Sequence, residues 1–170
     1  MGGCFIHERF ARDPEFPRLA GWWGQDKATR FKMENTFMPI QTAEGWQMSN
    51  PPILSLAAIR ASLDQFKDAG GMEPLRKKSE ALTGFFDSAL QSELGDQVTA
   101  ITPRDSRARG CQLSLKINSG AGRSVHDELE SIGVRSDWRE PNVIRAAPVP
   151  LYNSFEDVWQ FVQRLKSCLK

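Results

Sequence analysis

The sequence predicts an α+β fold, in which long helices accompany a small sheet. Apolar residues recur at helical spacing over 53–69 and again over 72–94, whereas residues 112–117 alternate strictly between apolar and polar. After position 95 the pattern changes to short strands and short helices. With 170 residues, 40% of them hydrophobic, the chain is long enough to bury a core of its own.

The first predicted element is a short buried strand at Cys4-Phe5-Ile6. Residues 10–50 show no strong periodicity, and loops of this length within a compact domain are usually functional. Ser49-Asn50-Pro51-Pro52 then opens a helix, because a capping side chain and two prolines precede an apolar stripe. Gly70-Gly71 ends that helix.

A second helix is predicted from about Met72 to Leu94, and Gly95 ends it. Its inward positions are Leu75, Leu82, Phe86, Ala89 and Leu90. Strands are expected at Val98–Thr102 and Gln112–Ile117, the second with its apolar side chains on one face. Ser124 is expected to cap a short helix after them.

The last helix is predicted to begin beside Asn153 or Ser154, either of which is a suitable N-cap. Glu156 or Asp157 follows three residues later, as in a capping box. The apolar stripe of this helix is Phe155, Val158, Trp159, Val162 and Leu165.

A strand near Ile144 is predicted before that helix, and Arg145 lies at its end. A guanidinium held between two rigid elements can bind a carboxylate through two parallel hydrogen bonds, which suits recognition of an amino-acid-like substrate. The alternative is a structural salt bridge to Asp137 or Glu140.

Trp22 and Trp23 lie between two glycines, which indicates a loop that places an aromatic ring in a site. The alternative is that both rings fill a core. Asn50 stands at a predicted helix start, where free N–H groups favour an anion. The alternative for Ser49 and Asn50 is that they serve only as caps.

Composition excludes several classes of function. A net charge of +1 gives no electrostatic reason to bind nucleic acid or an acidic membrane. Three cysteines without CxxC spacing are typical of reduced thiols in a cytosolic protein, and no stretch is long enough for a membrane span. His7-Glu8 lacks the second histidine of a zinc motif, so no metal site is predicted, and His126 is expected to be solvated. Gly120-Ala121-Gly122 suits a loop better than a phosphate site.

The segment from Asp137 to Phe155 resembles the C-terminal signature of kynureninase. Four earlier stretches fit the same family in the same order: Gly21–Met33, Ser49–Ile53, Arg76–Gly84 and Arg109–Leu113. The resemblance runs nearly end to end, but it covers only the C-terminal part of the family pattern. It implies a pyridoxal-phosphate enzyme of the aspartate-aminotransferase-like fold type I. Such an enzyme hydrolyses L-kynurenine, or 3-hydroxykynurenine, to anthranilate, or 3-hydroxyanthranilate, and L-alanine in tryptophan catabolism.

The same resemblance implies a domain plan and a set of site residues. Residues 1–70 would be the end of the large cofactor-binding α/β domain with the start of a connecting helix, and residues 71–170 the C-terminal small α+β domain. Trp22 would reach the cofactor phosphate from the neighbouring subunit of a homodimer, with Asn50 as its partner. Arg145 would bind the substrate carboxylate, and Ser49 and Asn50 would complete the substrate site. Family members often carry histidine after Trp-Trp-Gly, where this chain has Gln25.

The Schiff-base lysine of the family is not recognisable in this chain, because its position would fall just before Gly2. Lys27 and Lys32 lie in the cofactor-proximal loop, but neither matches it. We therefore expect this chain alone to be inactive and not to hold the cofactor covalently. The alternative is a cofactor-free α+β binding or regulatory module related to the enzyme.

Overall fold

The computed structural model describes residues 3–169 and divides the chain into two compact units, one ending at Leu63 and the other beginning at Asp64. Each unit has an architecture of its own. The first is mostly irregular, and the second contains a sheet with helices.

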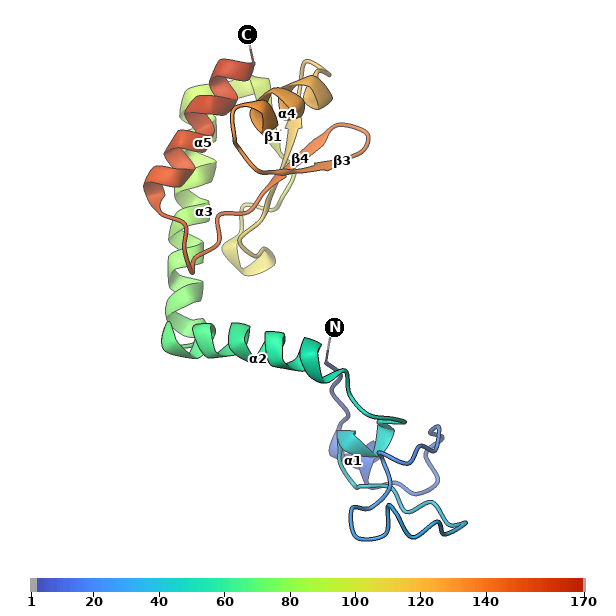
Figure 1. The fold of residues 1–170 in the computed structure, drawn as a ribbon. Coiled ribbons are helices and arrows are strands. Elements are labelled where there is room, and N and C mark those ends of the chain that lie inside the picture. The colour runs from blue at the N-terminus through green and yellow to red at the C-terminus, as the bar shows by residue number, and fades with distance from the viewer. Residues whose placement is uncertain (1–2, 170) are drawn as a thin grey trace. The chain divides into compact units, whose positions relative to one another are not determined.

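The second unit is built on a four-stranded antiparallel sheet of order β1-β2-β4-β3 (Figure 1). Its strands are β1 (Val98–Ala100), β2 (Leu113–Ile117), β3 (Asp137–Arg139) and β4 (Val143–Ala146). In the central pair, Leu115 lies opposite Ile144 and Ser114 lies opposite Arg145. Because side chains alternate along a strand, these two pairs point to opposite faces of the sheet.

One face of the sheet is buried and the other is open. The buried face carries Leu113, Leu115, Ile117, Ile144 and Ala146, each at most 7% exposed. The open face carries polar side chains at the alternate positions, among them Ser114, Lys116, Asp137 and Arg145. The sheet therefore presents one polar surface to its surroundings.

Helices α3 (Met72–Leu94), α4 (Gly122–Ser131) and α5 (Phe155–Cys168) supply the rest of this unit. α3 packs along α5, and α4 packs on α5 and β4 (Figure 1). The core that they share with the sheet is Leu82, Phe86, Ala89, Leu90, Leu94, Val125, Leu129, Val158, Val162, Leu165 and Cys168. The α+β prediction is confirmed.

Most of the predicted elements of this unit occur where the sequence placed them. α3 has the predicted bounds, and Gly95, with a φ of 50°, follows it as the first residue of a short 3-10 turn, η2 (Gly95–Gln97). The capping box of α5 is formed by Ser154, which accepts a hydrogen bond from the Asp157 backbone while the Asp157 side chain accepts one from the Ser154 backbone.

Two details of this unit differ from the prediction. α4 begins at Gly122, and the Ser124 hydroxyl donates back to the Ala121 carbonyl at 2.9 Å instead of capping the helix. A side chain at position 122 would meet the Trp138 ring at 3.2 Å, so glycine lets this helix end approach β3. β3 itself was not predicted.

The loop between β1 and β2 contains a 3-10 turn, η3 (Ser106–Ala108), and two arginines fasten it to α3. Arg76 donates to the backbone carbonyls of Arg109, at 3.1 Å, and Ser106. Arg109 in turn donates to the Thr83 hydroxyl at 3.3 Å. The side chains of these two arginines thus anchor the loop to α3.

The first unit contains α1 (Glu8–Ala11), the 3-10 turn η1 (Ala43–Trp46) and the first part of α2 (Ile53–Asp68). Two arginines hold its irregular segments. Arg18 stacks over the Trp46 ring at 3.9 Å and donates to the Asp13 carbonyl at 2.7 Å. Arg30 stacks over the Trp23 ring at 4.4 Å and donates to the Trp23 carbonyl at 2.5 Å.

The predicted strand at Cys4-Phe5-Ile6 is wrong. These residues are in irregular backbone, and Phe5 is 86% exposed. No segment among residues 3–169 pairs with them, and an apolar triplet without a partner strand forms no ladder.

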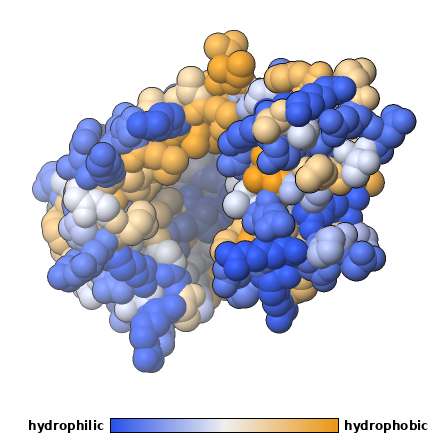
Figure 2. All heavy atoms as spheres, turned by 90° about the horizontal axis from the view of Figure 1, so that it is seen from below, coloured by the Kyte–Doolittle hydropathy of each residue, from blue (hydrophilic) through white to orange (hydrophobic). Residues whose placement is uncertain are grey.

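The helix predicted after Pro52 is confirmed as α2, but its apolar residues are not buried. Ile53, Leu54 and Leu63 are 71%, 87% and 58% exposed. Figure 2 shows hydrophobic residues interspersed with hydrophilic ones on the face of the molecule that it draws. Within residues 3–169, no helix is long and apolar enough to cross a membrane.

Candidate functional site

Arg145 lies on β4, on the open face of the sheet. Its register partners are Ser114 on β2 and Asp137 on β3. The Ser114 N–H donates to the Thr102 hydroxyl at 2.8 Å, and the Ser114 carbonyl accepts from Ile101. The N–H and carbonyl groups of Ser114 thus point away from β4. Ser114 and Arg145 therefore form a non-hydrogen-bonded pair, in which opposite side chains lie close together. Arg145 therefore stands between a serine and an aspartate.

The side chain of Arg145 is 30% exposed and forms an ion pair with Asp137. Its Nε donates to Asp137 Oδ2 at 2.6 Å, and its Nη2 donates to the same oxygen. Arg139 Nε lies 3.1 Å from that oxygen as well. The hydrogen bond from Arg145, above all, lowers the pKa of Asp137 below its ordinary value. Arg139 is a site neighbour that sequence reasoning missed, although alternation along β3 places it beside Asp137.

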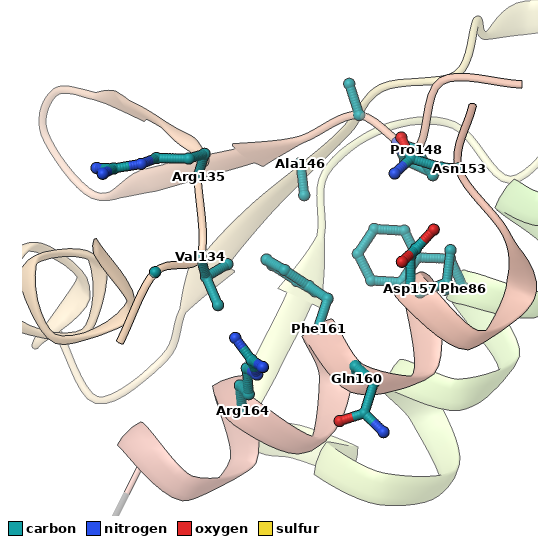
Figure 3. A pocket seen from close by; sticks show the side chains of 13 residues that line it. Phe86, Val134, Arg135, Ala146, Pro148, Asn153, Asp157, Gln160, Phe161 and Arg164 are labelled. Atoms are coloured by element: carbon teal, nitrogen blue, oxygen red, sulfur yellow. The ribbon is translucent and has the colours of Figure 1, made fainter. Parts of the chain in front are cut away.

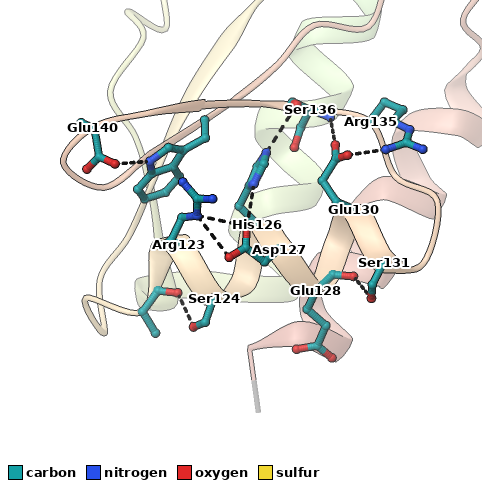
Figure 4. A network of polar contacts seen from close by, with 12 residues as sticks. Arg123, Ser124, His126, Asp127, Glu128, Glu130, Ser131, Arg135, Ser136 and Glu140 are labelled. Carbon is teal, nitrogen blue, oxygen red and sulfur yellow. Dashed lines mark hydrogen bonds and ion pairs between the residues drawn. The ribbon is translucent and has the colours of Figure 1, made fainter.

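The salt bridge considered as an alternative for Arg145 is thus present, and Asp137 is the partner. Glu140 instead accepts a hydrogen bond from the Trp138 indole at 2.9 Å (Figure 4). The assignment of Arg145 to a substrate carboxylate stays a prediction. The ion pair does not use the whole guanidinium, since no bond of Nη1 to another described residue is formed.

Trp22 and Trp23 have different environments. Trp22 is 45% exposed, and its ring meets the Trp23 ring edge-on at 5.2 Å and the Phe31 ring at 5.7 Å. Trp23 is half-buried beneath Arg30. Within residues 3–169 the Trp22 indole N–H has no hydrogen-bond acceptor, so this donor is available to a ligand.

Glycines bring the Trp22 segment against the Ser49 segment. A Cβ built on Gly21 would lie 2.2 Å from the Met48 Cα, and one on Gly24 would lie 2.8 Å from the Gly45 carbonyl oxygen. Only glycine permits backbones to approach so closely. Trp22 and Ser49 are therefore each one residue away from the same contact.

Ser49 and Asn50 are exposed and precede α2 instead of beginning it. α2 starts at Ile53, and the Pro52 carbonyl accepts its first bond, from Leu56. Two prolines separate Asn50 from the helix, and a residue before proline is held extended. Neither polar side chain has a hydrogen-bond partner among residues 3–169, so the interpretation of both as caps is wrong. Asn50 does not lie at the helix end itself.

Gln25 is buried at 8% exposure and has a clear structural role. Its side-chain amide donates to the Thr29 hydroxyl at 2.8 Å, and its carbonyl oxygen accepts from the Met38 N–H at 2.9 Å. Backbone bonds on either side, between Asp26 and Met38 and between Gly24 and Ile40, complete this pairing. The residue that departs from the family pattern thus joins two stretches of the irregular segment.

Trp22, Gln25 and Arg30 also line a pocket of about 400 Å³ in the first unit. Its wall includes Met33, whose φ is 56°, an uncommon value for a residue with a side chain. Neither Lys27 nor Lys32 lines it. Lys27 instead forms an ion pair with Glu44 at 2.9 Å.

A second pocket, of about 380 Å³, lies beside α5 in the second unit (Figure 3). Phe161 and Arg164 from α5 face Val134 across it. Its polar side chains are already engaged: Arg164 donates to the Ile132 carbonyl, and Asn153 accepts from the Val149 N–H. Arg145 does not line this pocket.

His126 is not solvated as predicted, since its side chain is 12% exposed. Its Nε2 lies 3.4 Å from the Ser136 carbonyl oxygen and its Nδ1 lies 3.6 Å from Asp127 (Figure 4). The Trp138 ring covers it at 6.0 Å. Among residues 3–169, no group of three or more side chains could hold a metal ion.

Comparison with known proteins identifies the relatives of this chain. The family model described as kynureninase C-terminal domain matches residues 75–165. The chain is 52% identical over 164 residues to a kynureninase of Koribacter versatilis, covering 96% of this chain and 38% of that protein. It is 52% identical over 169 residues to a kynureninase of Stenotrophomonas maltophilia, covering 98% of this chain and 40% of that protein. The chain thus spans about two fifths of the length of these curated relatives.

Solved structures with the same fold include two of C-DES. One is a variant with glycine covalently linked to its PLP cofactor, and the other is the cystine C-S lyase in complex with its reaction product, cysteine persulfide. The TM-score is 0.70 in both cases, at 18% sequence identity and 88% coverage of this chain. The first match covers 37% of the C-DES chain and the second 38%. This likeness establishes the fold, which is that of PLP-dependent fold type I enzymes.

Proposed function

This chain belongs to the kynureninase family, and from that premise we propose that it is the C-terminal part of an enzyme that hydrolyses L-kynurenine, or 3-hydroxykynurenine. The products are anthranilate, or 3-hydroxyanthranilate, and L-alanine. The observation that carries the proposal is Arg145, which lies inside the matched family domain on an open sheet face. The alternative of a cofactor-free binding module is not favoured by the identity of about 50% to kynureninases.

In this proposal Arg145 binds the α-carboxylate of the substrate. Its guanidinium is partly exposed, always charged, and can offer two parallel N–H groups to a carboxylate. Ser49 and Asn50 are proposed as further substrate-binding residues, because their exposed polar side chains have no partner among residues 3–169. These residues bind and orient, and none of them is the group that performs the chemistry.

Trp22 and Asn50 would hold the phosphate of pyridoxal phosphate. Both offer N–H donors without a partner among residues 3–169, and the contact of Gly21 with Met48 holds their segments together. Donors of this kind fit a phosphate group. Pyridoxal phosphate, when bound, supplies an electron sink for cleavage of the carbon–carbon bond.

We propose further that residues 1–70 and 71–170 correspond to the end of the large cofactor domain and to the small domain. The site would be shared between the two subunits of a cytoplasmic homodimer. Cys4, Cys111 and Cys168 are all free thiols, as expected of a reducing compartment. Light scattering of the purified protein tests the assembly, and a strictly monomeric species at high concentration would contradict it.

The chain alone is proposed to be inactive, because no lysine in it matches the family position. Incubating the purified chain with pyridoxal phosphate, reducing with borohydride and mapping adducts by mass spectrometry tests this point. We expect no stoichiometric label on a single lysine and no release of anthranilate from L-kynurenine. Labelling of Lys27 or Lys32 together with turnover would overturn the proposal and indicate a catalytic amine in this chain.

The role of Arg145 is tested in a complete enzyme. In a chimaera, this chain replaces the matching 169-residue region of the Stenotrophomonas maltophilia kynureninase. We expect the chimaera to release anthranilate from L-kynurenine. Arg145→Lys keeps the charge but loses the planar two-point contact, so kcat/KM should fall by about tenfold or more. A folded Arg145→Lys chimaera with unchanged kcat/KM would refute the assignment.

A further inference from the structure

The ion pair between Arg145 and Asp137 uses only one edge of the guanidinium. Nε and Nη2 both donate to Asp137 Oδ2, and these two groups form the side edge of an arginine. The opposite edge is formed by Nη1 with the second hydrogen of Nη2. Within residues 3–169, the Nη1 of Arg145 has no acceptor, and this atom is not buried. One edge is fixed while the other is open.

We propose that Asp137 is a positioning residue, which holds Arg145 by its side edge so that its end edge receives the carboxylate of an amino-acid substrate. This inference rests on the proposed function of Arg145. It also resolves the two interpretations of that arginine, because a structural salt bridge and a substrate contact can occupy different edges of one guanidinium.

Strand pairing makes Asp137 suited to this task. Asp137 and Arg145 are register partners on β3 and β4, so their Cβ atoms are held a few ångströms apart by the sheet. Arginine otherwise has several rotatable bonds, and fixing its side edge removes that freedom before a ligand binds. The restraint thus comes from two neighbouring strands and not from a flexible loop.

The charges around Asp137 also favour an anion. Arg139 Nε shares the same carboxylate oxygen at 3.1 Å, so one negative charge faces two positive charges. The group of three side chains keeps a net charge of +1, and within residues 3–169 these side chains form no further ion pair that would neutralise it. A substrate carboxylate would neutralise the remaining positive charge.

Electrostatics and positioning predict opposite results for Asp137→Asn. Removing the aspartate charge makes the surroundings of Arg145 more positive, and Coulomb attraction alone would tighten the binding of a carboxylate. If Asp137 instead positions the guanidinium, its loss weakens binding although the local charge has become more favourable. The sign of the change therefore distinguishes a positioning residue from a competitor for Arg145.

The test uses the same chimaeric holoenzyme, with steady-state kinetics on L-kynurenine. We expect Asp137→Asn to raise KM by about tenfold with kcat changed less than threefold, as for the loss of one positioned charged contact. Asp137→Glu keeps the carboxylate and should recover part of the loss. The matched control is Asp127→Asn, which removes another surface aspartate paired with an arginine, Arg123, at 3.0 Å in the same unit. This control should leave KM unchanged.

A second readout isolates the carboxylate. The decarboxylated analogue of kynurenine lacks the group that Arg145 would bind, so its inhibition constant should be the same in the parent and in Asp137→Asn. If Asp137→Asn leaves KM unchanged or lowers it while Arg145→Lys impairs the enzyme, positioning by Asp137 is refuted and the substrate role of Arg145 stands. If Arg145→Lys has no effect, the proposed function of this site fails, and the inference fails with it. Circular dichroism verifies that each variant folds. If Asp137→Asn does not fold, the KM of Asp137→Glu is used for the test in its place.

Discussion

Gly21 lies directly against the backbone of Met48. A Cβ at position 21 would fall 2.2 Å from the Met48 Cα and 2.4 Å from its carbonyl oxygen. Backbone atoms cannot move aside as the end of a side chain can, so one of the two segments must shift if a methyl group is added. The contact also restrains the backbone of Trp22 and Ser49, because Trp22 follows Gly21 and Ser49 follows Met48 in the chain.

Gly21→Ala should therefore loosen the first unit. We expect a local loss of about 1 to 3 kcal/mol, as for overpacking a close contact. Amide hydrogen exchange over residues 21–24 and 45–48 measures it. Gly3→Ala is the control, since a Cβ there has nothing within 4 Å. Equal protection of these segments in the variant and the parent would show that the contact is not needed.

The ion pair of Asp137 should make stability depend on pH in the acid range. Its pKa is lowered in the folded chain, so its contribution is fully present above the ordinary aspartate pKa near 3.8 and is lost as the pH falls through the lowered value. The difference in unfolding free energy between the parent and Asp137→Asn should shrink below about pH 4 and stay constant from pH 5 to 8. Denaturant unfolding at each pH measures it, and a difference as large at pH 2 as at pH 7 would contradict the pairing.

The second unit was predictable where local sequence determines the structure. α3 runs from Met72 to Leu94 because glycines bound a helical repeat of apolar residues on both sides. The alternation of β2 matches its burial. β3 escaped prediction because Asp137-Trp138-Arg139 has no apolar alternation and is fixed only by pairing with β4.

The candidate site was predictable in its residue types but not in its contacts. Arg145 and its possible partner Asp137 follow from sequence, whereas the sharing of one carboxylate oxygen with Arg139 requires the register of two strands. The first unit lacks periodicity, and its backbone is placed by close glycine contacts such as that of Gly21. Such contacts join residues distant in sequence and leave no repeating pattern to detect.

The three thiols should differ in reactivity. Cys4 is exposed, Cys111 is half-buried and Cys168 is buried, and burial raises the pKa of the Cys168 thiol. Because the thiolate is the reactive form, a disulfide reagent at pH 8 should label Cys4 first and Cys168 last. Peptide mass mapping at successive times gives the order, and the denatured chain, in which all three react alike, is the control. Early labelling of Cys168 would indicate that α5 does not pack as described.

Gln25 supplies one donor and one acceptor to its buried contacts, with Thr29 and Met38, and only a side chain with both can replace it. A neutral histidine has one of each, but its protonated form has no acceptor for the Met38 N–H. Burial beside that N–H should lower the pKa of a histidine at position 25. Its contribution to stability is then present above the ordinary value near 6.5 and is lost as the pH falls.

Gln25→His should match the parent at pH 8 and be less stable by about 1 to 2 kcal/mol at pH 5, whereas Gln25→Ala should be destabilised at both. Hydrogen exchange of residues 24–40 at the two pH values measures this, and a pH-independent Gln25→His would refute the requirement for an acceptor.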